Sequence, residues 1–386
     1  MILLISYGGG HITIITRVYN FLINNGVDAK ILPLTTGVGY CLRNSIEFVK
    51  IENFFNIDNV DYNFKDKIIE IAKENHDKEM NFPFSHTLAY YGIGLSQLFS
   101  EKGYSAGLKF YKENGRKSFL PTNFAEQVIR DLNPKAIITT NIPRMELAFR
   151  KVGMAMRIKV FAIDDLNGYF GDIENIYSDV VFVDNVKAIE RVKSYQKSGE
   201  IIVSGNPVYE DIFKLRKKIK RKNNNDLIII LQNGVRDLKT NEVHEFSESF
   251  FKKFFSNLEK LNFFNSFDKV TIRFHPSMNK RKYWESENFQ IDTEENLHQS
   301  LLNHSSVLGL TSTAIYEAYL MGCFVYNLSF KKDFFCLPIE YIGDINLNGD
   351  VKFYKENPEP VLNHETHNKQ SLEIIYNKLN YEVFKN

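Results

Sequence analysis

Short apolar runs recur along the whole chain, and a turn and a helical pattern follow most of them. Ile2–Tyr7 is such a run, and a glycine loop and the helical pattern Ile12–Asn25 connect it to the next run, Asp28–Leu34. A strand, a loop, a helix and a second strand in this order form the repeating unit of a parallel sheet. The chain therefore predicts an α/β fold.

The alternating pattern occurs twice. In the first half, the further strands that we predict are Ala136–Thr140, Lys159–Ile163, Val180–Val183 and Glu200–Ser204. In the second half, the predicted strands are Asp226–Leu231, Val270–Phe274, Val307–Leu310 and Phe324–Leu328. Helical patterns lie between them, including Asp66–Glu79 and an amphipathic, Phe-rich stretch at Val243–Leu261.

A basic, Asn-rich segment separates the two halves. Residues 214–225 have the sequence KLRKKIKRKNNN, and we predict that they are a linker. A solvated helix end with a loop would explain the same residues, and so would a patch that faces phosphate or an anionic membrane. We predict one doubly wound domain at 1–213 and a second at 226–386, facing each other across a cleft. Ligands of such sheets bind at the carboxyl ends of the strands.

Composition excludes several classes of protein. Of 386 residues, 44% are hydrophobic, which is too much for a disordered chain. The 48 basic and 47 acidic residues nearly cancel, so no nucleic-acid partner is expected. No apolar run is long enough to span a bilayer, and three scattered cysteines suggest neither a disulfide framework nor a zinc site. We expect a cytoplasmic protein, with peripheral contact at the inner membrane face as an alternative.

Two predicted strands of the first half end in residues that can carry chemistry. Gly8, Gly9 and Gly10 follow the first strand and precede His11, which is either a general base or a histidine that caps a tight turn. The loop is not a dinucleotide fingerprint, because Thr13 stands where a third glycine is needed. Asp164 and Asp165 follow Lys159–Ile163 and could act as a base or bind a metal or a sugar hydroxyl; a simple turn is the alternative.

The second half offers several groups that could bind phosphate or ribose. A small loop, a strand end and a helix start carry them: Gly234, Arg273, His275, Pro276, Thr311, Ser312 and Thr313. Glu317 lies one helical turn past Thr313, where its carboxylate could hold two ribose hydroxyls. For each of these residues an ordinary turn or helix cap is the alternative. No D-x-D pattern suited to a metal is present.

These segments resemble the GT-B class of nucleotide-sugar glycosyltransferases. The glycine loop is similar to the acceptor-side loop of that class, IIVSGNPVYEDI to the segment that closes its N-terminal domain, and GLTSTAIYEAYLMGCFVYNL to its donor-binding signature. The resemblance implies two Rossmann-like domains, an N-terminal one for the acceptor and a C-terminal one for the nucleotide donor. It further implies that Glu317 holds the donor ribose and that Ser312 and Thr313 contact phosphate. Cys323 and Phe324 stand where the signature usually has a proline.

The segment Arg273–Pro276 resembles the HP motif of bacterial sialyltransferases and related capsule enzymes. That resemblance implies that His275 contacts the donor phosphate. Those enzymes also carry a D/E-D/E-G motif, to which DDLNG at 164–168 is similar apart from two residues inserted before Gly168.

The resemblance implies a metal-independent glycosyltransferase. The nucleotide sugar would be its co-substrate, no cofactor would be needed, and His11, Asp164 or Asp165 would be the base. The acceptor would be a surface glycan such as capsule or lipopolysaccharide, a lipid-linked sugar or a protein. A nucleotide-sugar 2-epimerase or hydrolase, a glycerol-phosphate transferase and a non-catalytic nucleotide-sugar-binding subunit are alternatives.

Overall fold

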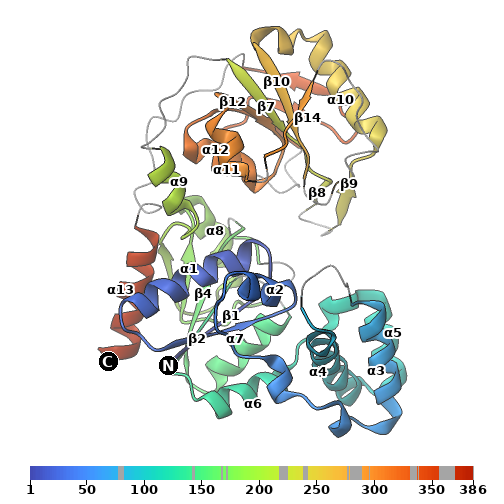
Figure 1. Cartoon of the computed structure of the whole chain (residues 1–386), viewed down its shortest axis with the longest axis vertical. Helices are drawn as coiled ribbons and strands as arrows, with labels where there is room; N and C mark the ends of the chain where they lie inside the picture. Colours follow the sequence, from blue (N-terminus) through green and yellow to red (C-terminus); the bar gives the residue numbers. More distant parts are fainter. Residues whose placement is uncertain are drawn as a thin grey trace. The chain divides into compact units, whose positions relative to one another are not determined.

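The buried apolar runs of the first half form one six-stranded parallel sheet (Figure 1). The computed structural model describes residues 1–76, 82–140, 144–166, 168–170, 173–216, 225–237, 242–275, 278, 289–294, 296–330, 337, 339–355 and 370–385. The strand order is β2-β1-β3-β4-β5-β6. The strands are β1 (Ile2–Ser6), β2 (Ala29–Pro33), β3 (Ala136–Thr140), β4 (Lys159–Ile163), β5 (Val180–Val183) and β6 (Glu200–Val203).

Helices cover both faces of this sheet, and alternate strand residues pack on each layer. Leu3 and Ile5 of β1 pack with side chains of α3, α4, α6 and α7, whereas Ile2 and Leu4 pack with α1. The helices are α1 (Gly10–Asn24), α2 (Thr36–Arg43), α3 (Tyr62–Glu74), α4 (Phe84–Lys102), α5 (Tyr104–Asn114), α6 (Thr122–Leu132), α7 (Met145–Ala155) and α8 (Val186–Tyr195). Burial on both faces explains why these strands are apolar without alternation.

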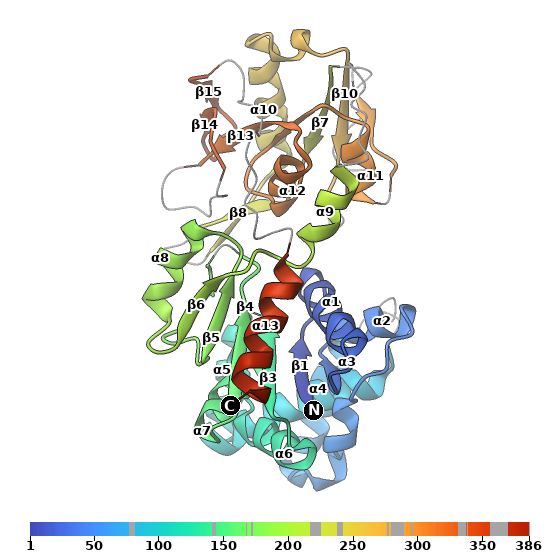
Figure 2. The same cartoon turned by 90° about the vertical axis from the view of Figure 1, so that its left-hand side faces the viewer.

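The last helix of the chain, α13 (Ser371–Phe384), belongs to the first sheet. It lies beside α1 (Figure 2), and it buries Ile375 and Leu379 in the same core cluster as Ile2 and Leu4. The compact units are therefore Met1–Val208 with His367–Asn386, and Tyr209–Thr366. This division differs from the domain at 226–386 that we predicted, because an amphipathic pattern shows that a helix buries a face but not which sheet covers it.

The second unit contains a seven-stranded sheet with the order β11-β10-β7-β12-β13-β14-β15. All neighbours are parallel except β14 and β15. The strands are β7 (Asp226–Ile230), β10 (Lys269–Arg273), β11 (Gln290–Ile291), β12 (Ser306–Gly309), β13 (Phe324–Ser329), β14 (Gly343–Ile345) and β15 (Val351–Phe353). The helices are α9 (Tyr209–Arg216), α10 (Glu248–Lys260), α11 (Leu297–Leu302) and α12 (Thr313–Met321).

The predicted helix Val243–Leu261 is two elements. Its first residues form β9 (Val243–Glu245), which pairs with β8 (Gly234–Arg236) in a separate small sheet. The helix α10 begins only after Ser247, whose hydroxyl accepts a hydrogen bond from Phe250 N at 3.2 Å and caps it. The predicted linker also begins inside a helix, since residues 214–216 belong to α9, and residues 217–224 lie outside the described residues.

No helix in the described part of the chain is both long and apolar enough to cross a membrane. Cys41 and Cys323 are buried free thiols.

Candidate active site

Three strands that lie side by side in the first sheet are followed by helices whose N-cap residues have positive φ angles. Gly9, Thr35 and Arg144 cap α1, α2 and α7, and their φ angles are 71°, 48° and 75°. Glycine adopts positive φ without penalty, but Thr35 and Arg144 hold a strained backbone there. Strained backbone of this kind clusters at functional sites. The carboxyl edge of β2, β1 and β3 is therefore a candidate for the active site.

The predicted glycine loop lies at this edge, and packing explains part of it. A Cβ atom on Gly8 would stand 1.8 Å from Thr36 Oγ1, so the loop and α2 approach each other too closely for a side chain. Gly9 has positive φ, whereas a Cβ on Gly10 would meet nothing within 4 Å. Close packing against α2 therefore requires a glycine at position 8, and the positive φ angle favours a glycine at position 9. Gly10 leaves open space beside the first turn of α1.

His11 and Asp165 lie against each other although β3 separates the two strands that they follow. His11 stands in the first turn of α1, after β1, and Asp165 follows β4. The distance from His11 Nδ1 to Asp165 Oδ2 is 2.6 Å, and the two side chains are 19% and 8% exposed. A carboxylate at Nδ1 favours the tautomer with the proton on Nδ1, which leaves the lone pair on Nε2. A partly exposed imidazole oriented in this way can act as a general base.

Charge around His11 favours its protonated form. Burial alone would lower the pKa of His11, but the Asp165 carboxylate, helped by Glu146, more than offsets this effect. Arg144 opposes the two acids with a smaller contribution. The pKa of His11 is therefore raised above its ordinary value, which makes the imidazole a stronger base.

Asp164, the neighbour of Asp165, serves the loop instead. Its Oδ1 accepts a hydrogen bond from Leu166 N at 3.0 Å, and its Oδ2 accepts one from Gly168 N at 2.6 Å. The side chain is completely buried, and burial together with the Asp165 charge raises the pKa of Asp164 to about 7. Of the two predicted carboxylates, only Asp165 contacts His11.

Glu146, which sequence reasoning missed, is a completely buried acid beneath this site. It lies in the first turn of α7, and its carboxylate accepts hydrogen bonds from Tyr7 N at 3.0 Å and from Thr140 N and Oγ1, both at 2.8 Å. Burial raises its pKa, although His11 and Arg150 act in the opposite direction. The sequence signal that could have identified Glu146 is its position at the start of a helix that follows a buried strand.

His86 on α4 supports the strained turn at Thr35. The ring is 1% exposed, its Nε2 accepts a hydrogen bond from Thr35 N at 3.1 Å, and its Nδ1 lies 3.3 Å from Glu52 Oε2. Both ring nitrogens are thus engaged, so His86 is placed to hold the backbone.

In the second unit, Gln232 joins two of the predicted donor loops. Its amide nitrogen donates to Thr311 Oγ1 and to Gly234 O, both at 2.7 Å, and its amide oxygen accepts from Thr311 N at 3.1 Å. Gly234 begins β8, where a Cβ atom would lie 2.3 Å from His244 O. Close approach of the paired strand therefore explains this glycine, and Thr311 is tied to the loop after β7.

The start of α12 keeps the arrangement that the sequence predicted. Ser312 is the N-cap, and its Oγ accepts a hydrogen bond from Ala314 N at 3.3 Å; Thr313 begins the helix. Glu317 lies one turn on, and its Oε2 is 2.6 Å from His298 Nε2, with both side chains about one-fifth exposed. One carboxylate oxygen is therefore held by His298 of α11, and Glu317 is fixed in direction.

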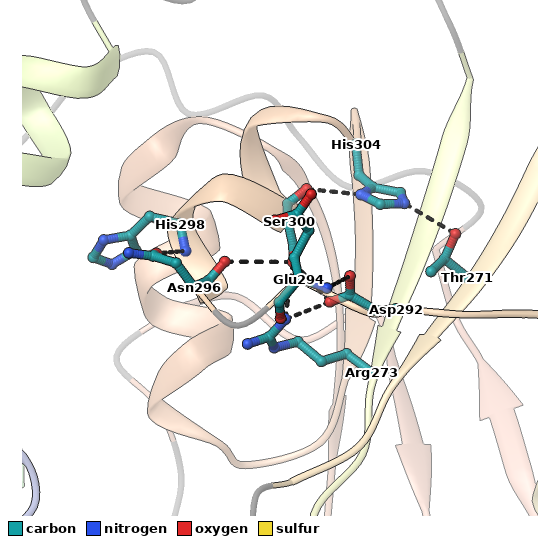
Figure 3. A network of polar contacts seen from close by, with 8 residues as sticks. All are labelled: Thr271, Arg273, Asp292, Glu294, Asn296, His298, Ser300 and His304. Atoms are coloured by element: carbon teal, nitrogen blue, oxygen red, sulfur yellow. Dashed lines mark hydrogen bonds and ion pairs between the residues drawn. The ribbon is translucent and has the colours of Figure 1, made fainter.

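Arg273 is part of a network that fastens α11 to the sheet (Figure 3). Its Nη1 forms an ion pair with Asp292 and donates to Ser300 Oγ at 2.9 Å and to Glu294 O at 2.8 Å. Ser300 Oγ in turn donates to Asp292 Oδ2 at 2.7 Å. These contacts place Arg273 in the packing of α11, and a role for it at the donor phosphate stays a prediction.

Two predicted donor-binding residues, His275 and Pro276, follow β10, and a further histidine, His304, follows α11. The carbonyl oxygen of His275 accepts a hydrogen bond from Met278 N at 2.9 Å, which makes a turn after the strand. Pro276 lies outside the described residues. His304, which closes α11, bonds Ser300 O through Nδ1 at 2.8 Å and Thr271 Oγ1 through Nε2 at 3.0 Å.

Two solved structures resemble the chain along almost its whole length. The UDP-GlcNAc 2-epimerase from Neisseria meningitidis bound to UDP-GlcNAc has 12% identity and a TM-score of 0.54, covering 98% of this chain and 99% of that chain. The UDP-GlcNAc 2-epimerase from Methanocaldococcus jannaschii in complex with UDP-GlcNAc and UDP has 13% identity and a TM-score of 0.51, covering 98% and 100%. The likeness confirms the predicted fold, two Rossmann-like units of the GT-B class. No protein-family model matches the chain, and no curated protein matches its sequence.

Proposed function

We propose that the chain transfers a sugar from a nucleotide-linked donor to a hydroxyl group of a glycan, lipid-linked or protein acceptor. The observation that carries the proposal is the contact of 2.6 Å between His11 Nδ1 and Asp165 Oδ2 at the carboxyl edge of the first sheet. A transferase must remove a proton from the acceptor hydroxyl, and a histidine oriented by a carboxylate is suited to that step.

The proposed reaction is a single displacement. His11 Nε2 takes the proton of the acceptor hydroxyl while the acceptor oxygen forms a bond to the anomeric carbon of the donor. The bond from that carbon to the phosphate oxygen breaks, and the nucleotide leaves with the electron pair. Asp165 stabilises the imidazolium that forms. Displacement without a covalent intermediate inverts the anomeric centre, so we expect a product with inverted configuration.

On the donor side, we assign the nucleotide to the start of α12. Its helix N-terminus and the hydroxyls of Ser312 and Thr313 suit a phosphate that gains charge as the nucleotide leaves. Glu317, held at one oxygen by His298, keeps its second oxygen for ribose hydroxyls. His275, two residues past the end of β10, is assigned to the same phosphates by the resemblance of its segment to the HP motif.

Nucleotide-sugar 2-epimerisation is the second candidate. The structures from Neisseria meningitidis and Methanocaldococcus jannaschii are UDP-GlcNAc 2-epimerases, which supports this alternative on the same fold. An epimerase acts on the donor alone and must remove a proton from C2, for which the acids beside His11 would be available. The two reactions therefore differ in whether an acceptor is required.

Thermal shifts with CMP-, UDP-, GDP- and CDP-linked sugars test the donor site. A ligand at 100 times its Kd stabilises the protein by about 2.7 kcal/mol, so one nucleotide class should raise the melting temperature of the wild type. Glu317→Gln should lose that rise, and Glu190→Gln, a change of an exposed glutamate on α8, should keep it. No shift with any nucleotide would contradict both candidate functions.

Incubation with UDP-GlcNAc in D₂O then separates the candidates. An epimerase exchanges the C2 proton of the sugar for deuterium without an acceptor, which proton NMR detects. The transferase proposal expects no exchange at C2, and exchange by the wild type that His11→Asn or Glu146→Gln abolishes would replace it with the epimerase.

A further inference from the structure

Arg144 carries a positive charge whose electrostatic effect reaches His11. Its guanidinium carbon lies 4.4 Å from the centre of the Tyr7 ring, and the side chain is partly exposed. In the described part of the chain, Arg144 forms no ion pair with a carboxylate. Arg273, by contrast, is paired with Asp292. A contact with an aromatic face holds a guanidinium in place but leaves its charge available.

Glu146 does not serve as the missing partner. It is only two residues along α7, yet it is completely buried, and three hydrogen bonds from Tyr7 N, Thr140 N and Thr140 Oγ1 occupy its carboxylate. Its charge also acts on Arg144 and raises the pKa of the guanidinium, but the two side chains form no ion pair in the described part of the chain. The guanidinium of Arg144 shares a hydrogen bond with the Tyr90 side chain, and its other N–H donors are available to an anion from outside the chain.

Two tyrosines fix the position of this arginine. The Tyr7 hydroxyl accepts a hydrogen bond from Met145 N at 3.4 Å and lies 3.0 Å from the Tyr90 hydroxyl. Both rings are buried, and the guanidinium contacts the face of the Tyr7 ring and is hydrogen-bonded to the Tyr90 side chain. An arginine that is already ordered loses little side-chain entropy when it binds an anion.

The backbone of Arg144 is strained, and a glycine could form the same turn without that strain. Its φ and ψ are 75° and −126°, close to the 71° and −141° of Gly9 at the corresponding cap of α1. A glycine would hold the turn without strain. A strained cap that carries a charged side chain points to a role for that side chain.

The strand order places Arg144 at the reacting centre. It caps the helix that follows β3, and β3 lies between β1, which leads to His11, and β4, which leads to Asp165. The charge of Arg144 also acts on the titration of His11. An anion held by Arg144 would therefore lie next to the hydroxyl that His11 deprotonates.

We propose that Arg144 binds an acidic group of the acceptor, a carboxylate or a phosphate, next to the hydroxyl that receives the sugar. The proposal rests on the transferase function and specifies its acceptor class as anionic. A planar guanidinium binds either group with two parallel hydrogen bonds. The same charge contributes nothing to a neutral sugar, so it selects between acceptors.

Arginine modification by phenylglyoxal, mapped by mass spectrometry, tests the site in the intact protein. Glucose 6-phosphate, glucuronate and neutral glucose are the probes, and UDP is a separate arm. One of the two acidic sugars should slow the modification of Arg144, about tenfold at ten times its Kd, whereas glucose should not. Arg130, which is 65% exposed on α6, should react equally in every arm.

The arms separate the sources of the anion. Protection by glucose 6-phosphate alone assigns a phosphate, and protection by glucuronate alone assigns a carboxylate. Equal reactivity of Arg144 in all arms would overturn the proposal. Protection by UDP but by neither acidic sugar would also overturn it, because the arginine would then serve the donor. Failure here leaves the nucleotide thermal shifts unaffected, so it is distinguishable from failure of the transferase function.

Two variants separate binding from folding. Arg144→Gly relieves the backbone strain, so its melting temperature should not fall below that of the wild type, yet calorimetry should detect no binding of the acidic sugar. Arg144→Lys keeps the charge without the planar fork and should bind more weakly than the wild type. Wild-type affinity in Arg144→Gly would contradict the assignment.

Discussion

Asp164 and Asp165 are adjacent in sequence but have different partners. Asp164 accepts two backbone hydrogen bonds within its loop, whereas Asp165 contacts His11. The sequence predicted that this pair and His11 lie at strand ends, but it could not choose between the two acids, since the choice depends on which way each side chain points. Glu146 was missed for a related reason: its partners are Tyr7, which follows β1, and Thr140, which ends β3, and only the folded sheet brings these two residues together.

The first prediction concerns the charge of Asp165. Since the base must be neutral to accept a proton, activity should rise with pH through the pKa of His11, which Asp165 holds above the ordinary value of about 6.5. Asp165→Asn should move this midpoint to lower pH and reduce kcat by about 10²–10⁴-fold. The pH dependence of kcat/KM for both proteins is the measurement, and an unchanged midpoint would contradict the assignment.

The raised pKa of His11 also affects stability. Its pairing with Asp165 contributes fully below about pH 6.5, the ordinary pKa, and the contribution is lost as pH rises through the raised pKa. Urea unfolding of the wild type and His11→Asn should therefore differ most at acidic pH and least at alkaline pH. A difference that grows with pH would show the opposite sign.

The third prediction at the residue scale concerns Asp164. Its pKa is raised to about 7, so its contribution to stability is full below about pH 3.9 and is lost as pH rises through 7. Asp164→Asn should flatten this dependence. It should also cost about 1–3 kcal/mol at pH 5, because an amide cannot accept the bonds of both Leu166 N and Gly168 N. Exposed Asp131→Asn is the control for urea unfolding between pH 4 and 8.

At the scale of elements, the core strands could be predicted and the short ones could not. Ala136–Thr140 and Lys159–Ile163 have the predicted bounds because they are continuous apolar runs between polar turns. The strands β8 and β9 have three residues each and show no periodicity, so the pattern of Val243–Leu261 was assigned to one helix. Ser247, a good N-cap residue, was the signal that α10 begins later.

The helix α13 gives a prediction at the same scale. Leu379 is 1% exposed in the core of the first unit, whereas Tyr381 on the same helix is 55% exposed. Leu379→Ala should lower the free energy of unfolding by about 2–5 kcal/mol, and Tyr381→Ala should change it by less than about 0.5 kcal/mol. Hydrogen exchange should show the loss of protection in β1, β3 and β4.

The location of that lost protection is the decisive observation. Faster exchange confined to β7, β12 and β13 after Leu379→Ala would place the helix with the second sheet. Ion pairs support the first sheet, since Lys378 contacts Glu200 of β6 at 2.6 Å and Glu382 contacts Lys159 of β4 at 2.9 Å.

At the scale of the whole molecule, the sequence predicted two parallel α/β units, and the fold confirms them. The boundary could not be predicted, because the chain leaves the first unit at Val208 and returns to it at His367. Under the proposed function, His11 and Asp165 of the first unit would act on the acceptor, and the start of α12 with Glu317 in the second unit would bind the donor. A protein without the His11 side chain should therefore still bind the donor, whereas a protein without the Glu317 carboxylate should not.

Nucleotide release tests this division most directly. The wild type is incubated with the donor found by thermal shift and a panel of neutral and acidic sugars, and the freed nucleotide is measured. We expect acceptor-dependent release by the wild type, at least about 10²-fold slower release by His11→Asn with unchanged donor binding, and loss of donor binding in Glu317→Gln. Release by His11→Asn at the wild-type rate would contradict the central claim that the His11–Asp165 pair is the catalytic base.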